Sequence, residues 1–210
     1  MTISPSNILG VVLAGGQSRR MLGQDKSFLR LEECSLIERA GQRLAPQVAD
    51  VVINANGSLE QYSDLKFNLC PDIVDGHVGP LAGVLTGMRA AKHMPGISHI
   101  ATCAVDTPFF PKDYVAQLIS LLSGDQEISM ARSGDRIHPV FAIWPLSLED
   151  ELHRFVVLED KRKILEFANR YTLHEVRFDT DPIDPFFNVN TPEDFERAQA
   201  FIAGGAQVAL

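Results

Sequence analysis

A pair of glycines near the N-terminus is followed within a short stretch by three cationic side chains. The glycines are Gly15 and Gly16, and the cations are Arg19, Arg20 and Lys26. Glycines let backbone N–H groups approach an anion closely, while arginine and lysine supply charge-assisted hydrogen bonds to phosphate. This combination indicates a phosphate-binding loop, although its spacing matches neither G-x-G-x-x-G nor G-x-x-x-x-G-K-[ST]. An ordinary turn with solvated cations is the structural alternative.

Oxygen-bearing side chains further along the chain suit a metal ion that binds phosphates. Asp106 follows an apolar segment and precedes Thr-Pro, and a carboxylate in that position can hold Mg²⁺, which prefers oxygen ligands. Asn188 and Asn190 are two residues apart, so in an extended segment their side chains would face the same side and could reach a metal or phosphate. Alternatively, Asp106 caps the helix after Pro108, and Asn190 or Thr191 caps the last helix.

Three other segments carry polar groups whose roles the residues alone leave open. Asp72 and the glycine-rich run 76–83 could cover a nucleotide base or present a helix N-terminus to a phosphate, or could form a flexible loop. His138 starts an apolar strand and is expected to be a structural hydrogen-bonding residue. The basic run 161–163 is typical of a solvated helix face, but it could also receive an anionic acceptor.

Apolar periodicity and turn residues divide the chain into alternating strands and helices. Strands are predicted at residues 8–13, 51–53, 66–70, 99–105, 128–131, 140–144, 173–178 and 186–189. Helices are predicted at residues 35–45, 81–91, 112–122, 147–154, 162–170 and 192–202. The first helix begins with a capping box of Ser35 and Glu38, and the last begins with Thr191 and Pro192.

This alternation predicts an α/β fold with a Rossmann-like, doubly wound, mostly parallel sheet and helices on both faces. In such folds ligands bind beyond the C-terminal ends of the strands. The polar and glycine-rich segments follow predicted strands, so we expect them to meet in one site. Gly83 and Gly87 lie one turn apart on a predicted helix, which indicates close packing of that helix against a strand or loop.

The composition suits one domain of ordinary size. The chain has 210 residues, 45% of them hydrophobic, and no linker-like stretch divides it. Its net charge of -8 argues against broad nucleic-acid binding. The three scattered cysteines suggest neither a disulfide framework nor a zinc site. Neither a signal peptide nor an apolar run of about 20 residues is apparent, so we expect a soluble cytoplasmic protein that binds no membrane.

Together these segments resemble the molybdenum cofactor guanylyltransferases of the MobA type. Residues 13–26, Leu-Ala-Gly-Gly-Gln-Ser-Arg-Arg-Met-Leu-Gly-Gln-Asp-Lys, are similar to the signature L-A-G-G-x-S-x-R-M-G-x-D-K of that family, with Leu22 in place of its Met-Gly glycine. Five further motifs follow in the family's order, namely Asp72, Gly79-Pro-Leu-Ala-Gly, Asp106-Thr-Pro-Phe, His138-Pro-Val-Phe and Asn188-Val-Asn-Thr-Pro-Glu. The resemblance covers about residues 8–200.

The resemblance implies a single nucleotidyltransferase domain over residues 1–210, with a nucleotide-diphospho-sugar transferase-like fold. It implies transfer of GMP from GTP to molybdenum-carrying molybdopterin, with Mg²⁺ as cofactor. The implied catalytic residues are Arg20, Lys26 and Asp106, and Asp106 holds the metal. The implied binding residues are Leu13, Ala14, Gly15, Gly16, Lys26, Asn54, Asp72, Asp106, Asn188 and Asn190. The N-terminal part, about residues 8–125, would bind the nucleotide, and the C-terminal part, about residues 126–205, the acceptor.

The chemistry of that reaction explains why the chain shows no catalytic triad. A phosphate acceptor is already an anion and needs no general base, so catalysis would rest on positioning and charge neutralisation. A cytidylyltransferase or sugar-phosphate nucleotidyltransferase of the same fold is an alternative. A non-catalytic nucleotide- or cofactor-binding chaperone subunit is another, although such a binder need not keep Arg20, Lys26 and Asp106 together. Molybdoenzyme chaperones or other cofactor-biosynthesis proteins are further candidate partners.

Overall fold

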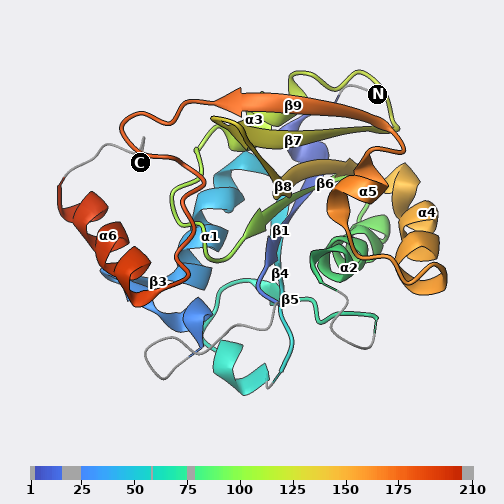
Figure 1. Cartoon of the computed structure of the whole chain (residues 1–210). Helices are drawn as coiled ribbons and strands as arrows, with labels where there is room; N and C mark the ends of the chain where they lie inside the picture. The colour runs from blue at the N-terminus through green and yellow to red at the C-terminus, as the bar shows by residue number, and fades with distance from the viewer. Residues whose placement is uncertain (1–2, 16–24, 58, 75–78, 205–210) are drawn as a thin grey trace.

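A central sheet organises the part of the chain that the computed structural model describes, which is residues 3–15, 25–57, 59–74 and 79–204. Seven strands are ordered β5-β4-β1-β6-β8-β7-β9 (Figure 1). Neighbouring strands in this sheet are parallel except at β8, which is antiparallel to β6 and β7. The strands are β1 (Ile8–Leu13), β4 (Asp50–Asn54), β5 (Asn68–Leu69), β6 (His99–Ala104), β7 (Glu127–Ser133), β8 (Arg136–Pro145) and β9 (Thr172–Phe178). The predicted mostly parallel sheet is confirmed.

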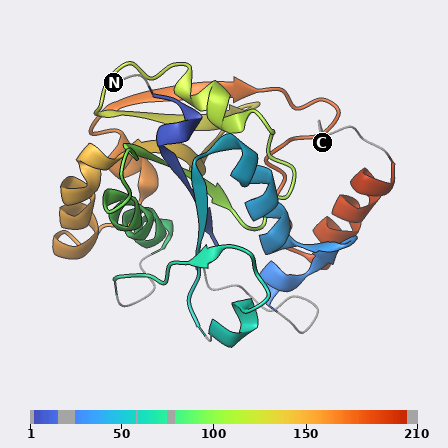
Figure 2. The ribbon, with the colours of Figure 1, turned by 180° about the vertical axis from the view of Figure 1, so that it is seen from behind.

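Helices cover both faces of this sheet, as predicted (Figures 1 and 2). One face carries α1 (Leu36–Leu44), α3 (Tyr114–Ile119) and α6 (Pro192–Ala203). The other carries α2 (Pro80–Lys92), α4 (Glu149–His153) and α5 (Ile164–Ala168). Strand β1 separates the two cores, because Ile8 and Val12 belong to the first while Leu9 and Val11 belong to the second. A strand buried on both faces explains its unbroken apolar run.

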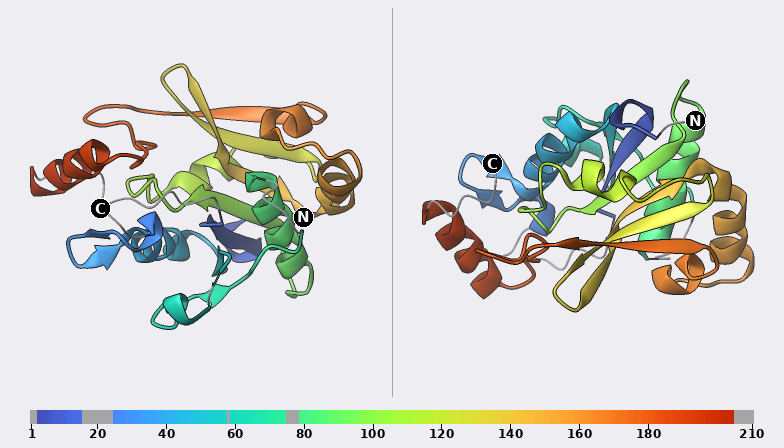
Figure 3. Two further views of the ribbon diagram at one scale, coloured as in Figure 1. Left: turned by 60° about the horizontal axis from the view of Figure 1, so that its bottom comes forward. Right: turned by 90° about the horizontal axis from the view of Figure 1, so that it is seen from above.

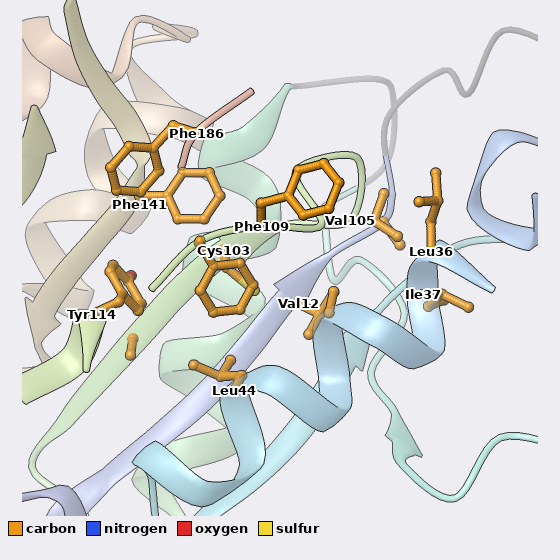
Figure 4. Packing of buried hydrophobic residues seen from close by; sticks show 14 of the residues in the cluster. Val12, Leu36, Ile37, Leu44, Cys103, Val105, Phe109, Tyr114, Phe141 and Phe186 are labelled. Carbon is orange, nitrogen blue, oxygen red and sulfur yellow. The ribbon is translucent and has the colours of Figure 1, made fainter. Parts of the chain in front are cut away.

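Helix α1 illustrates how local signals and packing agree. Ser35 and Glu38 form the predicted reciprocal capping box at its start. Its buried residues recur at helical spacing, and Figure 4 shows Leu44 between the helix and β1. Burial of each such side chain stabilises the fold by about 1.5–3 kcal/mol. The capping box therefore starts the helix, and burial of its apolar face holds it against the sheet.

Strand β1 is also the point where the winding of the sheet reverses. The chain passes from β1 through α1 on one face to β4, and later from β5 through α2 on the opposite face to β6. Because β4 and β6 flank β1, their C-terminal ends lie together at a topological switch point, where such sheets bind ligands. The left view of Figure 3 brings this edge of the sheet forward.

Several predicted elements differ from the structure. The predicted strand at 186–189 is wrong, because Phe187 closes a turn on the Asp184 carbonyl and Val189 bonds the Asp106 carbonyl outside the sheet. The predicted strand at 66–70 shrinks to β5, and the predicted helices at 112–122 and 162–170 shrink to α3 and α5. The predicted helix at 147–154 divides into a 3-10 turn (Leu146–Leu148), α4 and a π-helical segment (Arg154–Leu158).

Short elements absent from the prediction complete the fold. A hairpin of β2 (Arg30–Leu31) and β3 (Cys34–Ser35) lies beside α6 (Figures 1 and 2). The remaining 3-10 turns are η1 (Pro5–Asn7), η2 (Lys26–Phe28), η3 (Ala45–Gln47) and η4 (Leu59–Tyr62). Within the described ranges, none of the helices combines the length and apolar character needed to cross a bilayer.

Candidate active site

One cluster joins a cation, a carboxylate and an amide from three distant segments. The ammonium of Lys26 lies 2.7 Å from Asp106 Oδ2 and 2.7 Å from Asn190 Oδ1. Lys26 begins the η2 turn, which Asp25 caps by accepting the Ser27 N–H at 2.9 Å. Asp106 lies two residues beyond β6 and does not cap α3, whose N-cap is Asp113. We call Lys26, Asp106 and Asn190 the cationic cluster.

The segment before α6 runs beside the end of β6 and supplies the asparagines. The Val189 N–H donates to the Asp106 carbonyl at 2.8 Å, and the Thr107 hydroxyl donates to Asn188 Oδ1. Asn188 thus contacts Thr107 just beyond β6, whereas Asn190 contacts Lys26 of the η2 turn. Thr191 is the N-cap of α6, so the Asn190 side chain is left to accept from Lys26.

His138 supports this segment from the sheet. Its ring stacks on Phe186 with centroids 4.5 Å apart, and its Nε2 lies 2.7 Å from the Ser133 hydroxyl. Burial lowers the pKa of His138 below its ordinary value of 6.5, despite the opposing charge of Asp184. His138 is therefore a neutral, buried, hydrogen-bonded imidazole with the structural role expected from its position.

A second cluster lies on the other side of β1, at the ends of β4 and β5. The buried Asn54 side chain donates to Asp72 Oδ1 at 2.8 Å and to the Cys70 carbonyl at 3.0 Å. Asn56 donates to Asp72 Oδ2 at 2.6 Å and accepts the Asp72 N–H at 2.9 Å. We call Asn54, Asn56 and Asp72 the amide cluster.

The end of β1 lies between the two clusters. The Ala14 N–H donates to the Asn54 carbonyl at 2.8 Å, and the Leu13 carbonyl accepts the Val105 N–H at 3.2 Å. A side chain at Gly15 would come within 3.2 Å of Asn54 Oδ1 and 3.5 Å of Asp72 Oδ2. A glycine here therefore leaves the amide cluster uncovered on its β1 side.

Helix α2 packs against the amide cluster at Gly83 and against β1 at Gly87. An added Cβ at Gly83 would lie 2.3 Å from Asn54 Oδ1, and one at Gly87 would lie 2.6 Å from Val11 Cγ2. Both distances are far shorter than a normal contact, so the predicted close packing of this helix is confirmed. The helix starts after Gly79, which adopts a φ of 77°, with Pro80 in its first turn.

Some of the predicted site residues are not placed in either cluster. Gly16, Arg19 and Arg20, together with residues 76–78, lie outside the described residues. The basic run sits beside α5 on the other face of the sheet, where Lys161 pairs with Glu166 at 2.9 Å and Arg162 with Asp160 at 3.0 Å. Those pairs locally neutralise Lys161 and Arg162, which lie in the irregular segment before α5.

Sequence reasoning missed two side chains that complete the clusters. Asn56 orders Asp72, and Thr107 holds Asn188. The signal for Asn56 was present, because Asn-Ala-Asn after one strand has the same spacing as Asn-Val-Asn at 188–190. Thr107 gave no separate signal, since Asp-Thr-Pro also fits an ordinary helix entry.

The cationic cluster has the donor chemistry of a site for a hard cation. Lys26 already places a positive charge between a carboxylate oxygen and an amide oxygen. Across the described residues no three His, Cys, Asp or Glu side chains gather in a metal-binding group. One carboxylate with amide oxygens fits Mg²⁺, which takes few protein ligands and shares its remaining positions between water and phosphates.

Comparisons with known proteins identify the family of this chain. A family model described as the MobA-like NTP transferase domain matches residues 10–176. The chain is 40% identical to a molybdenum cofactor guanylyltransferase of Rhizobium meliloti, with 96% of each chain covered. It is 41% identical to one from Rhizobium leguminosarum bv. trifolii, again with 96% of each covered.

A solved structure shares the fold. The molybdopterin-guanine dinucleotide biosynthesis protein A of Archaeoglobus fulgidus superposes with a TM-score of 0.74 at 25% identity, covering 93% of this chain and 99% of that one. The matches span nearly the full length of the relatives as well as of this chain. The chain therefore belongs to the molybdenum cofactor guanylyltransferase family of MobA-like NTP transferases.

Proposed function

We propose that this protein transfers GMP from GTP to the terminal phosphate of molybdenum-carrying molybdopterin, releasing pyrophosphate. The observation that carries the proposal is the pair of clusters flanking β1 at the switch point of the sheet. The cationic cluster offers a lysine ammonium for a triphosphate, and carboxylate and amide oxygens for its metal. The other presents a carboxylate, as a hydrogen-bond-donating base requires. Membership of the guanylyltransferase family supports the same reaction.

The amide cluster is the proposed nucleoside end. An ionised carboxylate is an acceptor, with lone pairs on both oxygens. Guanine offers adjacent N1–H and N2–H₂ donors, whereas cytosine and adenine each pair a donor with an acceptor at the corresponding edge. Asp72 with Asn54 thus favours guanine at this end. The proposed nucleotide-binding region is the 8–125 part of the chain, which includes Leu13, Ala14 and Gly15.

The cationic cluster is the proposed phosphate end. Asp106 would hold Mg²⁺, with Asn188 and Asn190 as neighbouring oxygen donors. A bound Mg²⁺ supplies Lewis-acid stabilisation of phosphate oxygens. In the described structure Lys26 neutralises Asp106, and when the triphosphate is bound it is proposed to donate to phosphate oxygens instead. Gly16 and Arg20 are proposed to act at this end on the basis of their motif positions.

The proposed mechanism needs charge control rather than proton transfer. An oxygen of the acceptor phosphate attacks the α-phosphorus of GTP, the bond to the bridging oxygen of the β-phosphate breaks, and pyrophosphate leaves. Both reactants are anions, so Lys26 and Arg20 would offset their repulsion and the charge on the departing pyrophosphate. The neutral His138, stacked on Phe186, is not required as a base.

The acceptor is proposed to approach from the C-terminal part, residues 126–205. Asn188 and Asn190 come from this part and lie at the phosphate end, where the attacking oxygen must arrive. The proposed setting is the cytoplasm, which suits three free cysteines. Molybdoenzyme chaperones or other cofactor-biosynthesis proteins are proposed as partners that pass the cofactor on.

Pyrophosphate release tests the proposal. The protein is mixed with Mg²⁺, molybdenum-carrying molybdopterin and GTP, CTP or ATP in parallel, and release is expected with GTP. Preferential use of CTP would overturn the guanine assignment, and tight GTP binding without any release would favour a binding subunit. Asp106→Ala should lose most turnover, whereas Asp150→Ala, at a side chain that is 87% exposed, should not.

A further inference from the structure

An exposed asparagine is bonded twice to a single carboxylate-bearing residue. Asn56 donates its amide N–H to Asp72 Oδ2 at 2.6 Å, and its amide oxygen accepts the Asp72 N–H at 2.9 Å. Asn54 donates to the other carboxylate oxygen, Oδ1, at 2.8 Å. Each oxygen of Asp72 therefore accepts one amide hydrogen, from two asparagines at the end of the same strand.

This arrangement fixes the plane of the carboxylate. Rotation about the last bond of an aspartate side chain is broad and only weakly restricted by the side chain itself. One amide donor would leave the second oxygen of Asp72 free to turn, whereas two donors on opposite oxygens define the plane. A carboxylate has about four lone-pair positions, so each oxygen keeps one for a further donor.

The backbone carbonyl of Asn56 is hydrogen-bonded to a buried tyrosine. The Tyr62 hydroxyl donates to the Asn56 carbonyl at 3.4 Å, and Tyr62 is 5% exposed. The Tyr62 ring packs on Phe28 with centroids 5.3 Å apart, and Phe28 belongs to the turn that begins with Lys26. The asparagine is thereby attached to buried structure although its own side chain is at the surface.

Stability alone does not account for these bonds. A surface hydrogen bond contributes little to folding, because water competes for both partners. Asp72 lies next to Gly15 and Asn54, where a side chain in place of the glycine would cover it. The polar network instead orders a carboxylate that remains open to a ligand.

We propose that Asn56 is a positioning residue that sets the plane of the Asp72 carboxylate for recognition of the nucleotide base. It acts through Asp72 and need not contact the nucleotide. The inference rests on the proposed function for the identity of the base, which is guanine. Preorganisation of this kind reduces the ordering that nucleotide binding requires, so its loss appears in nucleotide affinity.

The test is Asn56→Ala in the full chain, with Asn169→Ala as a matched control at an exposed asparagine after α5. The KM for GTP should rise about tenfold in Asn56→Ala, as expected when a misoriented Asp72 loses one charge-assisted hydrogen bond to the base, with kcat within about twofold. The control should match wild type. In an Asp72→Ala background, Asn56→Ala should add nothing further, because the residue acts through that carboxylate.

Inosine triphosphate provides a second measurement, because hypoxanthine lacks the exocyclic N2 amine of guanine. Wild type should prefer GTP over ITP in kcat/KM, and Asn56→Ala should narrow that preference. An unchanged KM for GTP, an equal effect of Asn56→Ala with and without Asp72, or a wild type indifferent to the N2 amine would each overturn the inference. Failure of wild type to use GTP at all would instead overturn the proposed function.

Discussion

Substitution of one glycine in α2 should disturb the proposed nucleotide site through steric contact alone. A Cβ at Gly83 would lie 2.3 Å from Asn54 Oδ1 and 2.6 Å from Leu13 Cδ2. Asn54 cannot retreat freely, because its amide nitrogen donates both to Asp72 and to the Cys70 carbonyl. Gly83→Ala should therefore displace Asn54 and disturb the amide cluster.

The expected change in stability is the difference between a gain in helix propensity and a cost of overpacking. Alanine gains about 1 kcal/mol of helix propensity over glycine, while overpacking costs about 1–3 kcal/mol. The net loss of stability is then at most about 2 kcal/mol, which leaves the protein folded. In the proposed function, displacement of Asn54 misorients Asp72, and loss of one hydrogen bond from the base to that charged acceptor, worth about 1.5–3 kcal/mol, should raise the KM for GTP at least about tenfold.

Gly87→Ala is the matched control, because it lies one turn away in the same helix. Its Cβ would meet Val11 Cγ2 at 2.6 Å, which is core rather than site. Both variants should lose similar stability in thermal unfolding, but only Gly83→Ala should raise the KM for GTP. Equal KM values in the two variants would refute the argument that Gly83 is required by its contact with Asn54.

Three further outcomes follow from particular side chains. Lys26→Ala should weaken GTP binding by about 1.5–3 kcal/mol as well as lower turnover, and unchanged affinity in calorimetry would count against its phosphate role. Arg43→Met should destabilise the protein by about 1–3 kcal/mol, because buried Arg43 donates to the Phe109 and Phe110 carbonyls after Asp106. Denaturant unfolding measures the change, and an unchanged free energy of unfolding would contradict this prediction. Burial lowers the pKa of His99 from 6.5 to about 4, so the stability it contributes is complete above pH 6.5 and declines as the pH falls towards 4, by at most about 1.4 kcal/mol per pH unit. The unfolding free energy of His99→Leu should fall less steeply than that of wild type over this range, and parallel curves would contradict the assignment.

The fold could be predicted well where one signal dominated. Strand β1 has an unbroken apolar run, and α1 and α6 carry capping residues at their starts. The segment at 186–189 misled the prediction, because Phe186, Phe187 and Val189 have the composition of a strand. They are apolar because Phe186 packs on His138 and Val189 is buried beside Asp106, not because they join the sheet.

The candidate site was predictable as a set of strand-end residues but not as contacts. Asn54 ends a strand, and Asp72 and Asp106 each follow one; parallel topology brings such ends to one edge. The partners within each cluster depend on rotamers and loop paths that spacing does not encode. Asn56 is the clearest case, since only its reciprocal bonds to Asp72 distinguish it from an ordinary turn residue.

The two clusters differ in how they are built, and this should separate their effects on the reaction. The amide cluster rests on the ends of β4 and β5 and on α2, so it is ordered by the sheet itself. The cationic cluster joins a turn at Lys26 with the segment before α6, and the Val189–Asp106 bond links that segment to β6. In the proposed function, variants in the amide cluster weaken the hold on the base before reaction, so their effect should appear mainly in KM. Variants in the cationic cluster change the charge at the proposed phosphate end, so their effect should appear in kcat as well.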